Sequence, residues 1–266
     1  MNTKTLIIAF VTIALLVGGS YFYFNDDTLR GKVNETLAVE PTQVVPIIPS
    51  YNAVFVIFDP SGSGIYSYSV PRLKTEYLNS LIDRIISEGH GEVWLTYIVK
   101  DAFKNKVLHF SIAKSPQIPV QPVRFAGEPK YKFNTRIEQF NIDSLGHIKK
   151  LFLYNDSLNT MKQRFFAESQ AMINAAYARK KAGEDYSDVI GSLNAAGRSL
   201  ATVPADSIHF RSVLLISDGE QDLSPGSKPK KLNHIPDDVK IIMVNHSGSK
   251  NSVVAGRATE VDNLDR

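Results

Sequence analysis

The sequence predicts an α/β protein with a three-layer, doubly wound and mostly parallel sheet, preceded by one transmembrane helix. Three observations lead to this prediction. Continuous apolar runs at 53–58, 211–217 and 239–245 are typical of parallel strands that are covered on both faces. Segments with helical periodicity separate these runs, as in other alternating α/β chains. The first 24 residues contain an apolar stretch without a charged side chain.

The order of elements begins with the strand at 53–58 and a helix that opens at Pro71 and stops at Gly89. Two strands follow at 92–99 and 106–113. The connection between them is so short that it permits only an antiparallel hairpin, which predicts one antiparallel edge strand.

The segment 114–156 contains a Pro-rich basic stretch, which predicts an extended loop or insertion because proline fits neither a central strand nor a helix interior. A long helix is expected over about 157–182, and a second one is expected after Tyr186-Ser187-Asp188. The last segment, 248–266, is expected to be a tail or a last amphipathic helix.

The amino-terminal region predicts a membrane anchor at 1–24 and a linker at 25–50, before a main domain at 51–247. The apolar stretch 5–24 would span about 30 Å as a helix, the thickness of a bilayer's hydrocarbon core. Bulky aromatic residues follow Gly18-Gly19-Ser20 at its end, instead of the small-x-small site of a cleaved signal peptide, so an uncleaved anchor is favoured over a signal peptide. Lys4 before the stretch predicts a cytoplasmic amino terminus and an extracytoplasmic domain, periplasmic in a Gram-negative cell.

Composition excludes several classes of function. The formal net charge of +3 and the scattered lysines argue against a nucleic-acid partner. The chain has no cysteine, which excludes a disulfide framework, a thiolate metal site and a cysteine nucleophile.

A polar turn, DPSGSG, follows the strand at 53–58 and places Asp59, Ser61 and Ser63 at alternate positions. No Lys-Ser/Thr pair follows its glycines, so it is not a phosphate-binding loop. The G-x-S-x-G spacing of a hydrolase elbow is missing, although a hydrolase that uses Ser61 or Ser63, with His246 as the suggestively placed histidine, stays open. A plain turn whose hydroxyls cap the backbone, and a site for a hard cation, are the other two readings.

Three segments carry a resemblance to a known family. VFVIFDPSGSG resembles the first strand and D-x-S-x-S motif of a von Willebrand factor A domain, and VLLISDGE resembles the strand of that family that ends in a second aspartate. YSDVIGSL resembles the family's T-D-I-G helix start, with Ser187 in place of the threonine and 31 residues before Asp218. The resemblance covers 51–247, and the segment 114–156 has no counterpart in the family.

The resemblance implies a metal-ion-dependent adhesion site that holds Mg²⁺ or Mn²⁺, with a coordination position left open for a carboxylate of a protein partner. It implies a binding protein of a cell-envelope assembly and no catalytic residue. Thr202 is the alternative third hydroxyl. A metal-free scaffold that binds through its Pro-rich insertion remains a second reading. The implied metal ligands are Asp59, Ser61, Ser63, Ser187 and Asp218.

Overall fold

The computed structural model describes 50–60, 70–102, 105–180, 186–203, 208–223, 228, 231–245, 252–254 and 256–261. The chain divides into two compact units, Met1–Ile48 and Pro49–Arg266, and every described residue belongs to the second. The predicted anchor at 1–24 and nearly all of the linker at 25–50 therefore lie outside the described residues. Among the helices that are described, none is long and apolar enough to cross a membrane.

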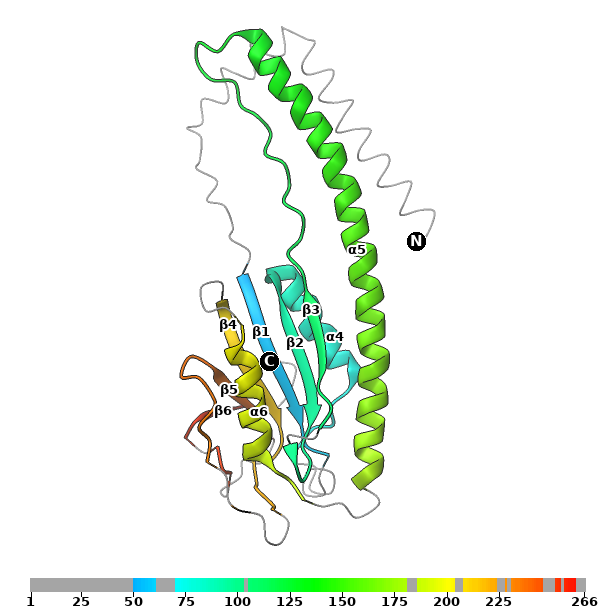
Figure 1. Cartoon of the computed structure of the whole chain (residues 1–266), viewed down its shortest axis with the longest axis vertical. Helices are drawn as coiled ribbons and strands as arrows, with labels where there is room; N and C mark the ends of the chain where they lie inside the picture. The colour runs from blue at the N-terminus through cyan, green and yellow to red at the C-terminus, as the bar shows by residue number, and fades with distance from the viewer. Residues whose placement is uncertain are drawn as a thin grey trace. The chain divides into compact units, whose positions relative to one another are not determined.

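A six-stranded sheet forms the centre of the described unit, in the order β3-β2-β1-β4-β5-β6 (Figure 1). Neighbouring strands run parallel except for β3, which pairs antiparallel with β2 at one edge. The predicted mostly parallel sheet with one antiparallel edge strand is thus confirmed. The strands are β1 (Ser50–Phe58), β2 (Gly89–Tyr97), β3 (Leu108–Ile112), β4 (Ile208–Ile216), β5 (Lys240–Val244) and β6 (Ala258–Val261).

The apolar run of β1 explains the three layers. Alternate side chains of a strand point to opposite faces of the sheet, so Val54, Val56 and Phe58 enter one core and Ala53, Phe55 and Ile57 enter the other. The first core is closed by α4 (Thr75–Glu88) and α5 (Lys130–Lys180), and the second by α6 (Val189–Ala201). Burial on both faces is what a continuous apolar strand requires.

The long helix corrects one prediction. α5 begins at Lys130 and runs for 51 residues, so the segment 114–156 is extended only in its first part and helical in its second. Its second half packs on the first core through Leu158, Phe165 and Met172, while its first half continues beyond the end of the sheet (Figure 1). The sequence hid this helical half because it has no single apolar stripe and includes Gly146.

The carboxyl-terminal segment corrects a second prediction. Ala258–Val261 form β6, which pairs parallel with β5, so of the tail or helix expected over 248–266 the helix is wrong at these four residues. β-Branched Thr259 and Val261 suit an extended edge strand.

The extended connection after β3 lies along the first half of α5 and is held at both ends. The hydroxyl of Tyr154 donates to the carbonyl of Ala113 (2.9 Å), and Arg136 donates to the carbonyl of Val123 (2.9 Å). Between these two hydrogen bonds the connection advances ten residues and α5 advances eighteen, which is about 27 Å of helix. A chain in polyproline II geometry, at about 3.1 Å per residue, covers about this length in ten residues. Pro116, Pro119 and Pro122, three residues apart, are its half-buried positions.

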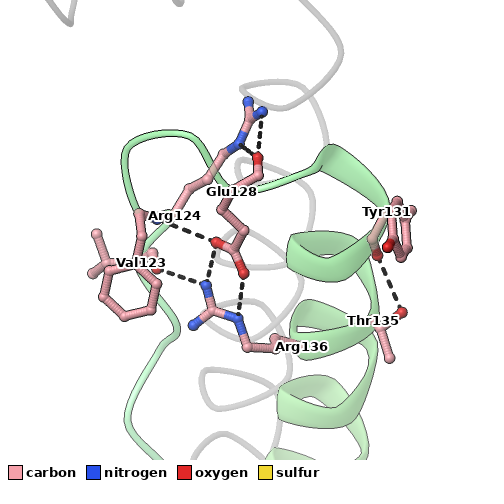
Figure 2. A network of polar contacts seen from close by, with 7 residues as sticks. Val123, Arg124, Glu128, Tyr131, Thr135 and Arg136 are labelled. Atoms are coloured by element: carbon pink, nitrogen blue, oxygen red, sulfur yellow. Dashed lines mark hydrogen bonds and ion pairs between the residues drawn. The ribbon is translucent and has the colours of Figure 1, made fainter.

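Arg136 closes the turn between this connection and α5 (Figure 2). Its guanidinium donates to both carboxylate oxygens of Glu128 (3.1 and 2.5 Å) and lies 4.9 Å from the ring centre of Phe125. Glu128 also accepts from the backbone N–H of Phe125 (3.1 Å), and Arg124 donates to the Glu128 carbonyl. The hydrogen bond from Arg136 holds the pKa of the Glu128 carboxyl below its ordinary value.

The ion pair of this turn is expected to persist to a lower pH than the ordinary pKa of a glutamate would allow. Because the pKa of Glu128 is lower in the folded state, its ion pair stabilises the turn above the ordinary pKa and is lost as the pH falls through the lowered value. A carbon-13 NMR titration of the Glu128 carboxyl should therefore give a midpoint below that of an exposed glutamate. Arg136→Gln should move the midpoint upward, and an unchanged midpoint in that variant would contradict the assignment.

Candidate metal centre

The candidate site lies where the order of the strands in the sheet reverses, between β1 and β4. From β1 the chain proceeds outward through β2 and β3 on one side, and β4, β5 and β6 lie on the other side. The carboxyl ends of β1 and β4 are therefore adjacent at a topological switch point, where ligands bind in open α/β sheets. Asp59 follows β1 directly, and its N–H donates to the carbonyl of Ile216, the last residue of β4 (2.9 Å). Asp218 follows β4 by two residues, so both acids lie at this edge.

The Asp59 carboxylate is buried and accepts two hydroxyl hydrogen bonds from different parts of the chain. Ser187 Oγ donates to Oδ1 at 3.4 Å, and Ser217 Oγ donates to Oδ2 at 3.2 Å. All three side chains are less than about a tenth exposed. Two oxygen donors that are 128 and 158 residues away in the chain thus converge on one carboxylate.

The loop after β4 is shaped around Asp218. The Asp218 carboxylate accepts from the N–H of Glu220 (3.0 Å), and the Ser217 hydroxyl accepts from the N–H of Gly219 (3.0 Å). Gly219 has φ +73°, and a β-carbon there would lie 2.3 Å from Ser252 Oγ. Glycine alone combines this positive φ with the absence of a β-carbon, so Gly219 determines the direction of the loop after β4.

Ser187 is held in place by the same loop. Its N–H donates to the carbonyl of Asp222 (2.7 Å), and the N–H of Asp222 donates back to the Ser187 carbonyl (3.0 Å). This two-residue bridge ties the entry to α6 to the segment that follows β4. The hydroxyl of Ser187 is thereby fixed beside Asp59.

Asp188 starts α6 next to Ser187. It is fully buried, and its Oδ1 accepts from the N–H of Gly191 (2.9 Å) and from the side-chain amide of Gln221 (3.1 Å). The Gln221 amide oxygen in turn accepts from the N–H of Ile190 (2.9 Å). Two side chains therefore satisfy backbone donors of the first turn of α6, the role of an N-cap.

Tyr177 of α5 supports the site from the first core. Its ring lies 5.8 Å from that of Phe58, the residue before Asp59, and its hydroxyl oxygen accepts from the N–H of Leu73 (3.2 Å). Burial raises the pKa of Tyr177, and the charge of Asp59 raises it further. Tyr177 is therefore a neutral phenol that packs under the end of β1.

The structure brings three of the five predicted ligands to one edge: Asp59 and Ser187 in direct contact, and Asp218 next to Ser217. Ser61 and Ser63 lie outside the described residues, as does His246. The alternative third hydroxyl, Thr202, is excluded. It lies at the other end of α6, which at 13 residues is about 20 Å long, and it donates to the carbonyl of Ser199.

Sequence reasoning missed Ser217, Asp188 and Gln221. The signal for Asp188 was its position directly before an apolar helical face, the usual place of an N-cap. Ser217 interrupts the apolar run of β4 immediately before the predicted ligand Asp218. Nothing in the sequence around Gln221 indicates its contact with a residue 33 positions earlier.

The donors present fit a hard cation. Two buried carboxylates, Asp59 and Asp218, follow adjacent strand ends, where a divalent ion could take both as ligands, directly or through water. Carboxylate and hydroxyl oxygens are ligands that Mg²⁺ accepts, and Mg²⁺ usually keeps several waters. Across the part of the chain that is described, no group of three or more His, Cys, Asp or Glu residues could hold a metal ion. The candidate set has two such residues and otherwise relies on serine.

The chain was compared with known families, characterised proteins and solved structures, and none of the three comparisons gives a match. The function is therefore inferred from the site.

Proposed function

We propose that this protein is a membrane-anchored binding protein with a von Willebrand factor A-like domain, which recognises a protein partner through Mg²⁺ or Mn²⁺ at the end of β1. The observation that carries the proposal is the contact of Ser187 with the Asp59 carboxylate, 3.4 Å apart, beside Asp218 at the topological switch point. The family resemblance of three separate segments of the sequence implies that these residues lie close together.

In this proposal Asp59, Ser187 and Asp218 hold the cation together with Ser61 and Ser63, and no residue has a bond-breaking role. The bound cation would supply a Lewis-acidic position for a carboxylate of the partner. The chain's own residues orient the ligands. The Ser187–Asp222 bridge fixes the hydroxyl, and Gly219 sets the direction of the loop that carries Asp218.

The proposed location follows from the sequence. An anchor at 1–24 would place the domain outside the cytoplasm in a cell-envelope assembly, and the linker at 25–50 would give it reach. The sequence offers no basic stripe for a nucleic-acid partner.

The proposal is tested by titrating the purified full chain with MgCl₂ and MnCl₂ in a calorimeter, after removal of metal with EDTA. We expect saturable binding of one ion and a higher melting temperature in its presence, because a ligand that binds only the folded state stabilises it. Partner capture from solubilised membranes should then require the metal. Absence of binding, with capture that persists in EDTA, would favour the metal-free scaffold that binds through 114–156.

A further inference from the structure

The arm is the part of the chain from 113 to 157, which comprises the extended connection after β3 and the first half of α5. It leaves the sheet at a defined end. Ile112, the last residue of β3, pairs with Gly91, and the neighbouring Gly89 pairs with Ser50 at the start of β1. The arm therefore starts at the end of the sheet where β1 begins, opposite the candidate metal centre, and continues beyond it (Figure 1).

Exposed apolar side chains are concentrated in the arm. Ten of the thirteen large hydrophobic residues that are exposed in the described part of the chain lie in it, although it is a small part of the structure. The three most exposed are in the connection, Val120 (90%), Ile118 (80%) and Val123 (73%), and Tyr131 (68%) and Phe125 (67%) lie around its turn. The others are Ile142, Leu145, Ile148, Phe152 and Leu153. Apolar exposure of this density indicates a surface that is covered in use.

The tip of the arm is also basic. Between 113 and 136 the chain has five basic side chains and one acidic side chain. The acid is Glu128, whose carboxylate is paired with Arg136, and Arg124 also contacts Glu128, so Lys130 and Lys132 carry the net positive charge of the tip. Exposed aromatic and aliphatic side chains beside basic ones are the composition of segments that bind anionic membrane surfaces.

We propose that the tip of the arm, residues 118–133, docks on an anionic lipid surface, with Val120, Val123 and Phe125 in the headgroup region. The distances permit this contact. The 25 residues between the apolar stretch 5–24 and Ser50 reach at most about 90 Å, and the arm extends about 42 Å from Leu158 to Lys130. This proposal rests on the proposed function in one respect: if residues 1–24 are an anchor, the lipid surface is that of the membrane that holds the anchor.

A second copy of the chain is a poorer occupant of this surface. Pairing of two arms through the exposed face of α5 would need apolar residues at heptad spacing. The seam at that spacing includes three charged residues and one threonine among eight positions, whereas the tip combines apolar and basic residues without such interruption. The seam positions are Tyr131, Thr135, Glu138, Ile142, Leu145, Lys149, Phe152 and Asp156.

The test uses the absence of cysteine, which makes a single engineered thiol unique. Val123→Cys is labelled with an environment-sensitive nitrobenzoxadiazole dye, since Val123 contributes only its backbone carbonyl to the turn. The full chain is reconstituted in phosphatidylcholine vesicles with or without phosphatidylserine. Gln163→Cys, on an exposed position of the same helix beyond the arm, is the matched control.

We expect the dye at position 123 to shift to the blue and to be quenched by lipids with a spin label on the acyl chain, most strongly with phosphatidylserine. The dye at position 163 should stay solvent-exposed. Equal, solvent-like spectra at the two positions in phosphatidylserine vesicles would overturn the proposal. Energy transfer between dyes on two copies without lipid quenching would overturn it as well, in favour of the second copy.

A charge variant separates lipid docking from loss of structure. Lys130→Glu with Lys132→Glu should weaken the tip contact about five-fold or more for each basic charge lost. Lys149→Glu with Lys150→Glu, farther along the arm, should change it much less. Unchanged quenching in the first variant contradicts the proposal. Both variants should keep the Mn²⁺ binding of the wild type, so failure here is distinguishable from failure of the proposed function.

Discussion

Asp59→Ala is expected to abolish binding of Mg²⁺ and Mn²⁺, with affinity reduced by at least about 100-fold. Even partners that only orient metal ligands cost about 10–100-fold when they are removed, and Asp59 is proposed to hold the ion or its waters. Its carboxylate also organises the hydroxyls of Ser187 and Ser217. Calorimetric titration of the full chain measures this effect.

Two further variants show whether the loss arises from the metal site. Ser217→Ala removes a hydrogen bond that orients the same carboxylate but removes no predicted ligand, so metal affinity should fall about 10-fold, less than in Asp59→Ala. Asp59→Asn keeps a hydrogen-bond acceptor and loses the charge, so it should fold and bind no ion. Fluorescence of Trp94, which is the only tryptophan and is buried in the sheet, reports folding in every variant. Metal binding by Asp59→Asn at the wild-type affinity would refute the assignment.

Asp188→Ala is expected to cause a large loss of stability, about 2–4 kcal/mol. The substitution removes the N-cap acceptor of the buried Gly191 N–H, which costs about 0.5–2 kcal/mol, and it also leaves the half-buried amide of Gln221 without this acceptor. Denaturant unfolding followed by Trp94 fluorescence measures it. Metal affinity should also fall, because Ser187 precedes this cap.

Asp188→Asn is the matched control for that prediction. Asparagine caps helices about as well as aspartate, so this variant should lose less than about 1 kcal/mol. If it is as unstable as Asp188→Ala, the charge of Asp188 and not its acceptor role stabilises the start of α6.

The sheet could be predicted from the sequence because its signals are local. An apolar run such as 53–58 has to be covered on both faces, and a connection as short as that between β2 and β3, residues 98–107, permits only a hairpin. The first half of α5 could not be predicted in this way. Its pairing with the connection after β3 is revealed only by the hydrogen bonds of Tyr154 and Arg136 to that connection.

Some residues of the candidate site could likewise be predicted from the sequence, and others could not. Asp59 and Asp218 follow strand ends, and that position alone marked them as candidates. The choice of Ser187 over Thr202 depended on spacing, and the structure decides it by placing Thr202 at the far end of α6. Ser217 and Gln221 act through contacts with residues more than thirty positions away, which no local pattern encodes.

The most direct measurement of the central claim is the anomalous diffraction of a crystal of this protein grown with MnCl₂. The account predicts one strong manganese peak at the carboxyl end of β1, within bonding or water-bridged distance of Asp59, Ser187 and Asp218. A crystal with manganese at other positions only, or with none at saturating concentration, would contradict it.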